Sequence, residues 1–389
     1  MTREEALQQS VTKSLRRAEI PGEHEARERT WRLVSVAFTE RVPTPRRPTR
    51  RLVPAIAVVV AGAAVAAALS PPGRAVFHAI RKTVGVEKAQ PALFSLPTGG
   101  QLLVASDGGI WVAQSDGSKR RLGSYGSAAW SPNGLFVAAT RRNGLYALTP
   151  SGEERWSLAR PGVRSPRWIG SRTDTRIAYT SRGVLRVVAG DGMGDESLGS
   201  APDMAHAPLA WRPGTRSLAY ALPQQAMLVV IDVAAHGDEL WSRRVAKVTK
   251  LEWSQDGKRL LVLMPKELRV YDERGRLVQH RRAGRDANDM DAAFLPGTHR
   301  VALMRSHGAR SDVLLFPGGP LLFHATGELQ DLTFSPDGKW LLVGWPAADQ
   351  LVFLRVTSGG GTRRITAVSN ISSQFRSRNF PRVEGWARS

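Results

Sequence analysis

The segment Trp253-Ser-Gln-Asp-Gly-Lys-Arg-Leu-Leu-Val-Leu-Met264 joins an aromatic residue, a short turn and a continuous apolar strand. Gly257 can adopt a positive φ and Asp256 can accept hydrogen bonds from local backbone, as a tight turn requires. Residues 268–271 alternate as a third strand would, and residues 276–279 follow a second turn. With the strand that ends at Trp253, these elements make a four-stranded antiparallel unit of about 40 residues, which is the size of a propeller blade.

The same pattern recurs along the chain. The clearest other copies are Trp130-Ser-Pro-Asn-Gly134 and Phe334-Ser-Pro-Asp-Gly338, and weaker copies begin at Phe94, Trp168, Trp211 and Phe294. A period near ~40 residues indicates a unit that buries its apolar face only by stacking on its neighbours. We therefore expect an all-β fold, a seven-bladed β-propeller over residues 89–389, with six blades as the alternative. The turn inside each unit favours this closed ring over a solenoid.

The pattern also predicts the strands inside the blades. The expected second strands are 135–140, 176–180, 217–222, 300–304 and 340–344, and the expected third strands are 144–148, 184–188, 227–233, 313–316 and 351–356. The first blade has only three candidates, at 101–105, 109–113 and 119–122. The segment Phe380-Pro-Arg-Val-Glu-Gly-Trp386 echoes Thr249-Lys-Leu-Glu-Trp253. We expect it to pair with residues 101–105, so that both ends of the domain share one blade.

These motifs resemble the Trp-Ser-Pro-Asp-Gly repeats of TolB-type β-propellers and, more loosely, the WD-repeat-like superfamily. The resemblance covers roughly residues 90–389 and lacks the Gly-His and Trp-Asp dipeptides of true WD repeats. It implies a propeller and names no activity, because the motif builds the blade.

Residues 52–69 contain no charged side chain and predict a single transmembrane helix. The long charged region ahead of them argues against a cleaved signal peptide. Between Arg41 and Arg51 there are five arginines, whereas on the other side Arg74, Arg81 and Lys82 are more widely spaced. This asymmetry predicts a cell-membrane protein with a cytoplasmic N-terminus and an extracytoplasmic propeller.

Residues 1–51 are expected to form a cytoplasmic helical head and a basic, proline-rich linker. An apolar stripe that runs from Trp31 to Phe38 is either a docking face for a partner or a surface for helix-pair packing. Residues 70–88 are expected to form a juxtamembrane amphipathic segment.

The layout of head, Ala-rich anchor, Ser70-Pro-Pro-Gly-Arg-Ala-Val76 and propeller resembles membrane proteins of high-GC actinobacteria. Some bacterial anti-sigma factors share this gross plan, which implies a head that sequesters a regulator. Many such heads carry a His/Cys zinc motif, whereas this one has only His24 and no cysteine.

The chain carries a net charge of +21 and no cysteine, so it has no disulfide and no thiolate chemistry. The positive charge suits a protein partner or an anionic envelope polymer. However, 46 of the 55 basic residues are arginine and they are scattered, with pairs such as Arg141-Arg142, so the codon usage of a GC-rich genome and solvated blade rims are the favoured explanation of the charge. Nucleic acid is not an expected partner for an outer domain.

No catalytic, cofactor-binding or metal motif is present, so the sequence predicts no catalytic residue, no cofactor and no metal ligand. The segment Ser335-Pro-Asp-Gly-Lys-Trp340 resembles a sialidase Asp-box, but its glycine is one place early, which favours a structural turn. The acidic segments 191–196 and 286–291 offer oxygen ligands for calcium, although solvated connectors are the default interpretation. His206 and His324 are candidates to meet in the central channel.

The sequence therefore favours a membrane-anchored extracytoplasmic propeller that binds an envelope component or a protein and is not an enzyme. The alternatives are a transmembrane signalling protein with an anti-sigma-like head and an enzyme with a pocket on the propeller axis. Neither the ligand nor the oligomeric state follows from the sequence.

Overall fold

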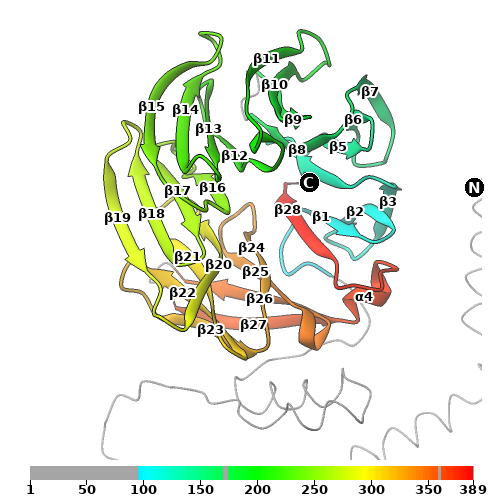
Figure 1. Ribbon diagram of the computed structural model, residues 1–389. Helices are drawn as coiled ribbons and strands as arrows, with labels where there is room; N and C mark the ends of the chain where they lie inside the picture. The colour runs from blue at the N-terminus through cyan, green and yellow to red at the C-terminus, as the bar shows by residue number, and fades with distance from the viewer. Residues whose placement is uncertain (1–94, 170–173, 358–360, 389) are drawn as a thin grey trace, which may run out of the picture. The chain divides into compact units, whose positions relative to one another are not determined.

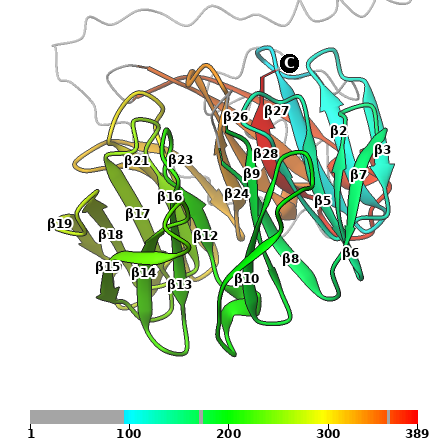
Figure 2. The same cartoon turned by 90° about the horizontal axis from the view of Figure 1, so that it is seen from above.

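The computed structural model describes residues 95–169, 174–357 and 361–388. They form seven four-stranded antiparallel sheets, arranged as blades around a central axis (Figure 1). Figure 2, turned by 90°, shows the strands running from one face of the ring to the other. The prediction of seven blades is confirmed, and the six-bladed alternative is wrong.

The strands of each blade follow one another from the axis outward. Blade 1 contains β28 (Arg382–Ala387), β1 (Gln101–Ser106), β2 (Gly109–Gln114) and β3 (Lys119–Gly123). Blade 2 contains β4 (Ser127–Trp130), β5 (Val137–Arg141), β6 (Gly144–Leu148) and β7 (Glu154–Ala159). Blade 3 contains β8 (Val163–Trp168), β9 (Arg176–Ser181), β10 (Val184–Ala189) and β11 (Glu196–Ser200). Blade 4 contains β12 (Leu209–Trp211), β13 (Ser217–Leu222), β14 (Met227–Asp232) and β15 (Asp238–Arg244).

Blade 5 contains β16 (Lys250–Trp253), β17 (Arg259–Met264), β18 (Glu267–Asp272) and β19 (Leu277–Arg282). Blade 6 contains β20 (Ala287–Phe294), β21 (Val301–His307), β22 (Arg310–Phe316) and β23 (Leu321–Thr326). Blade 7 contains β24 (Gln330–Phe334), β25 (Trp340–Trp345), β26 (Gln350–Val356) and β27 (Thr362–Ser369). The short helices are η2 (Met204–His206), η3 (Pro346–Ala348) and α4 (Ile371–Gln374).

The repeated turn has the same hydrogen bonds in blades 5 and 7. Ser254 Oγ donates to Asp256 Oδ1 (2.6 Å) and accepts from the Arg259 amide (2.9 Å). In blade 7, Ser335 makes the equivalent bonds to Asp337 (2.6 Å) and the Trp340 amide (3.0 Å). Gly257 has a φ of 67°, which an L side chain rarely adopts. The motif is therefore a structural turn, as its glycine position indicated.

An aromatic residue lies at or next to the end of each innermost strand and packs between neighbouring blades. Six of these residues were identified from the repeats: Trp130, Trp168, Trp211, Trp253, Phe294 and Phe334. The seventh place, in blade 1, belongs to Trp386 of β28 and not to Phe94, which lies outside the described residues. The assignment of Phe94 as the repeat aromatic of blade 1 was therefore wrong. The innermost strand of this blade comes from the C-terminal end of the chain.

The C-terminal strand closes the ring, as predicted. β28 pairs antiparallel with β1, with Leu102 opposite Trp386 and Ala105 opposite Arg382 (Figure 1). The Trp386 ring packs edge-on against Phe353 of blade 7, with the ring centroids 5.7 Å apart. The pairing leaves β1 without an exposed edge, which would otherwise be a site for aggregation.

The acidic segment 286–291 is not a connector, which corrects the expectation from the sequence. Nearly all of it belongs to β20, the innermost strand of blade 6. Its carboxylates fit there because Arg305 pairs with Asp289 (2.6 Å) and Lys250 pairs with Asp291 (2.8 Å). Buried charges of this kind are tolerated in a strand only when they are paired.

The predicted head (1–51), anchor (52–69) and juxtamembrane segment (70–88) lie outside the described residues. Within the part of the chain that the structure describes, no helix has both the length and the apolar character needed to cross a membrane.

Candidate functional site

The innermost strands of blades 1, 2, 3 and 7 begin at the same face of the propeller, where a pocket opens on the axis. This pocket, which we call the mouth pocket, has a volume of about 820 Å³. Its polar lining residues are Ser124, Ser127, Thr140, Arg141, Arg142, Arg164, Ser165, Arg167, His206, Asp331, Arg382 and Glu384. The repeated Ser-x-Asp-Gly turns follow the ends of the innermost strands and therefore lie at the opposite face.

A second cavity, the axial channel, continues from the mouth pocket along the propeller axis. It also has a volume of about 820 Å³ and is lined by all seven innermost strands. The two cavities share six residues: Ser165, Arg167, His206, Asp331, Val383 and Glu384. Further along, the channel is lined by Lys250, Glu252 and Asp291, and it ends among the aromatic residues of the inner strands.

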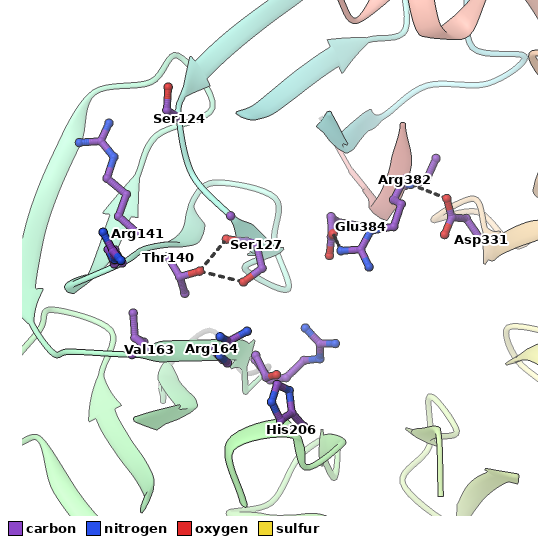
Figure 3. Close-up of a pocket in the computed structure, with 16 residues that line it drawn as sticks. Ser124, Ser127, Thr140, Arg141, Val163, Arg164, His206, Asp331, Arg382 and Glu384 are labelled. Carbon is purple, nitrogen blue, oxygen red and sulfur yellow. Dashed lines mark hydrogen bonds and ion pairs between the residues drawn. The ribbon is translucent and has the colours of Figure 1, made fainter. Parts of the chain in front are cut away.

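Positive charge dominates the mouth pocket, which is lined by five arginines and two carboxylates. One of the carboxylates, Glu384, is already paired with Arg382 at 2.8 Å. Figure 3 shows Arg141 and Thr140 on the blade 2 side, Arg164 and His206 on the blade 3 side, and Glu384, Arg382 and Asp331 across the opening. The pocket is thus basic on one wall and mixed in charge on the other.

Local packing fixes the orientation of Arg141. Its guanidinium carbon lies 4.3 Å from the centre of the Tyr125 ring and 5.4 Å from that of Tyr146. A guanidinium stacked on aromatic rings keeps the N–H groups of its edge available for a ligand. Ser127 and Thr140 also line the pocket, and their hydroxyl oxygens are 2.8 Å apart.

The carboxylates of the axial channel bind the backbone of the next blade. Glu252 accepts a hydrogen bond from the Phe294 amide (2.9 Å), and Asp291 accepts one from the Leu332 amide (2.8 Å). Asp331 accepts one from the Val383 amide of β28 (2.8 Å). These bonds link blades 5 to 6, 6 to 7 and 7 to 1 in succession.

Burial shifts the titration of these groups. It raises the pKa of Asp331 to about 7, although the hydrogen bond from the Val383 amide opposes the shift. Burial also raises the pKa of Glu252, against the opposing effect of Lys250. For Lys250, burial lowers the pKa, but the carboxylates of Asp291 and Glu252 outweigh it and the net shift is upward. The channel therefore holds two carboxyl groups that bind protons more readily than usual.

Arg167 lies between the two cavities, enclosed by the channel walls, so its exposed surface faces the channel. Burial lowers the pKa of Arg167, and Glu384 partly offsets the shift. An arginine remains charged under these conditions. Both the mouth pocket and the axial channel are therefore lined by the positive charge of Arg167.

The histidine prediction is half correct. His206 of η2 lines both cavities, whereas His324 lies on β23, the outermost strand of blade 6. The two histidines do not meet, because a residue of the fourth strand in a blade lies at the rim of the ring.

Acidic side chains of the candidate calcium segments have other partners. Asp195 is paired with Arg160 and with Arg186 (2.6 Å), and it also accepts a hydrogen bond from the Tyr179 hydroxyl (2.5 Å). Asp289 and Asp291 are paired with basic residues of blades 6 and 5. Over residues 95–169, 174–357 and 361–388, no group of three or more His, Asp or Glu side chains could hold a metal ion.

The sequence did not single out the arginines of the mouth pocket. Arg141 and Arg142 stood out only as one of several scattered pairs, and Arg164, Arg167 and Arg382 did not stand out at all. The signal that could have found them is their position. Arg167 lies near the end of β8, but the others lie at the beginning of an innermost strand or at or just past the end of a second strand, and these positions meet at one face of a propeller.

No protein-family model matches the chain, and no curated protein matches its sequence. Similarity to solved structures is confined to the fold. The β-propeller domain of Cps50 (Swd1) from Myceliophteria thermophila matches 70% of this chain and 99% of its own, with a TM-score of 0.55 and 15% identity. A chain of the Mitotic Checkpoint Complex matches 72% of this chain and 85% of its own, with a TM-score of 0.52 and 16% identity.

A chain of the hydrazine synthase from Kuenenia stuttgartiensis matches 59% of this chain and 75% of its own, with a TM-score of 0.46 and 14% identity. That likeness is too weak to carry an argument about function. The β-propeller domain of Cps50 (Swd1) and the seven sheets of this chain agree on a β-propeller fold.

Proposed function

We propose that this protein is a membrane-anchored, extracytoplasmic binding module that holds a protein partner or an envelope component at its mouth pocket. The observation that carries the proposal is the mouth pocket, a hollow of about 820 Å³ with five arginines at the end of the axial channel. β-Propellers commonly serve as interaction modules, and concave sites with a few convergent polar groups are the usual place for ligands.

The charge of the pocket supports binding of a negatively charged group. Among the described residues, Arg141, Arg142 and Arg164 have no carboxylate within ion-pair distance, unlike Arg160 and Arg186, which both pair with Asp195. Holding several unneutralised arginines together costs electrostatic free energy, which an anionic ligand recovers on binding.

Site-specific photo-crosslinking in intact cells tests the proposal. A photoreactive amino acid at position 165 would lie in the mouth pocket, and one at position 258 would lie on a repeat turn at the opposite face. We expect a defined crosslinked product from position 165 and none from position 258. Equal products from both positions, or none from position 165, would contradict the proposal.

The membrane location rests on the sequence, namely the uncharged run 52–69 and the arginines before it. Reporter fusions to the C-terminus test the topology, and a cytoplasmic C-terminus would reverse it. A mature N-terminus near residue 70 would mean that the apolar run is a cleaved signal. The signalling alternative concerns the head, and a pulldown with residues 1–45 tests it.

One observation favours a second function, acid–base catalysis in the axial channel. Burial raises the pKa of Asp331 to about 7, which is close to the value that suits a general acid or base at neutral pH. If this function is correct, turnover of glycoside, ester or peptide substrates should fall on Asp331→Asn substitution and depend on pH near 7. Turnover that survives the substitution would exclude Asp331 from the chemistry.

A further inference from the structure

The mouth pocket has an uneven distribution of charge that restricts the ligands it can hold. Arg141, Arg142 and Arg164 come from blades 2 and 3, whereas Asp331 and Glu384 come from blades 7 and 1. Figure 3 shows Arg141 and Arg164 on one side of the opening and Glu384 and Asp331 on the other. A ligand that fills the pocket therefore meets hydrogen-bond donors on one wall and acceptors on the other.

The donor wall matches phosphate chemistry. Each guanidinium presents parallel N–H groups that bind two oxygens of a phosphate at once. The stack on Tyr125 (4.3 Å) restricts Arg141 to one plane, so binding costs less side-chain entropy than it would for a freely rotating arginine. Ser127 and Thr140 add hydroxyl groups to this wall; the bond between them uses one of their two hydroxyl hydrogens, which leaves one to donate to a further oxygen.

The acceptor wall excludes ligands that carry only negative charge. Although Arg382 partly neutralises Glu384, the two carboxyl groups make this wall less favourable than the arginine wall for a second phosphate, and they can accept hydrogen bonds from hydroxyl groups. In addition, no Phe, Tyr or Trp is among the described residues that line the pocket, so a nucleic-acid base has no aromatic surface on which to stack. The arrangement disfavours both polyphosphate and nucleic acid.

We infer that the mouth pocket binds a phosphate ester of a sugar or polyol, with the phosphate on Arg141, Arg142 and Arg164 and the hydroxyl groups on Glu384 and Asp331. The inference rests on the proposed binding function and names its ligand. A volume of about 820 Å³ accommodates a ligand of this kind, since small-molecule pockets span ~300–1,000 Å³. The same group occurs in polyol-phosphate polymers and in phospholipid headgroups.

Isothermal titration of the full chain in an uncharged detergent tests the inference. The probes are glycerol 3-phosphate, glucose 6-phosphate, glucose and tripolyphosphate. We expect both phosphate esters to bind, glucose to bind far more weakly, and tripolyphosphate to bind no better than the esters in spite of its higher charge. Preference for tripolyphosphate would show attraction by net charge alone and would overturn the inference.

Two substitutions locate the binding. Arg164→Gln should weaken glycerol 3-phosphate binding by about tenfold or more, the effect of one lost charge-assisted pair. Arg282→Gln is the matched control, because Arg282 is an exposed arginine on β19, the outermost strand of blade 5. It removes the same charge and should leave the affinity unchanged. Equal weakening by both substitutions would refute a local site.

The acceptor wall has its own test. Glu384→Ala removes the partner that holds Arg382 at 2.8 Å. We expect inorganic phosphate to bind this variant more tightly and the advantage of glucose 6-phosphate over inorganic phosphate to shrink. An unchanged ratio of the two affinities would contradict the assignment of the hydroxyl groups to Glu384.

A final comparison distinguishes a polymer from a membrane headgroup as the source of the ligand. It also distinguishes a failure of the ligand inference from a failure of the proposed binding function. Soluble oligo(glycerol phosphate) that competes with glycerol 3-phosphate indicates a polymer, whereas competition only by phosphatidylglycerol vesicles indicates a membrane headgroup. If neither the esters nor these competitors bind, but position 165 still crosslinks to a protein, the ligand inference is wrong and the proposed binding function stands.

Discussion

Replacing Asp331 by Asn tests whether the closing strand is held by a group that titrates near neutral pH. Asp331 lies at the start of β24 and accepts a hydrogen bond from the Val383 amide of β28 at 2.8 Å. Its φ of 55° is left-handed, a conformation that Asn tolerates well. Asn also keeps a carbonyl oxygen as the acceptor, so the substitution removes the charge and leaves the geometry intact.

The expected effect follows from the pKa of this carboxyl group in the two states. Burial raises it to about 7 in the folded protein, from 3.8 in the unfolded chain. Between these values the folded state holds a proton that the unfolded state has lost, so the free energy of unfolding falls as the pH rises through this window. A shift of about three units corresponds to at most ~4 kcal/mol, and we expect about 2–4 kcal/mol. The Asn variant should therefore be more stable than wild type by this amount at pH 8.

Chemical denaturation of both proteins between pH 4 and pH 8, followed by tryptophan fluorescence, measures the difference. The comparison cancels the pH dependence of all other groups. The two unfolding free energies should converge near pH 4 and separate as the pH rises toward 7. Parallel curves, or a variant that is less stable at pH 8, would refute the reasoning.

Three further changes test the fold. Trp253→Ala should lower the unfolding free energy by about 3–5 kcal/mol, because it removes a buried aromatic side chain; Trp253→Phe should cost less, since the indole N–H has no partner among the described atoms. Deleting residues 380–389 should lower the melting temperature sharply and promote aggregation by uncovering β1, and a truncated protein that melts like the full chain would contradict the closure. Asp107→Asn should lower the free energy of unfolding at neutral pH, because hydrogen bonds from Asn379 hold the pKa of Asp107 down to about 2. In unfolding measurements, the difference between variant and wild type should disappear as the pH falls through this value.

The blade was predictable because its signals are local. A turn such as Ser335 to Gly338 is fixed by hydrogen bonds between residues two and five positions apart, so the same residues recur wherever the turn recurs. The closing strand was predictable for a related reason, since residues 380–386 repeat the pattern of an innermost strand. The acidic segment 286–291 misled the prediction, because its partners Arg305 and Lys250 are distant in the sequence.

The mouth pocket was not predictable from a motif. Arg141, Arg164 and Arg382 come from three different blades, and no spacing along the chain relates them. Their convergence follows only from the closed ring, in which the beginnings of the innermost strands meet at one face. A motif search detects the repeated turns, and these lie at the face opposite the mouth pocket.

The carboxylates of the channel are bonded within the protein, whereas Arg164 of the mouth pocket has no carboxylate partner among the described residues. Substitutions at the two places should therefore affect stability and ligand binding separately. Asp291 bonds the Leu332 amide of the next blade and pairs with Lys250, so Asp291→Asn should cost about 1–3 kcal/mol of stability and leave phosphate-ester binding unchanged. Arg164 has an exposed side chain and no carboxylate partner among the described residues, so Arg164→Gln should change stability by less than about 0.5 kcal/mol and lose the binding. Denaturation and titration of the two variants measure both quantities. If Asp291→Asn abolished binding at unchanged stability, the ligand would occupy the axial channel, and the mouth pocket would be only its entrance.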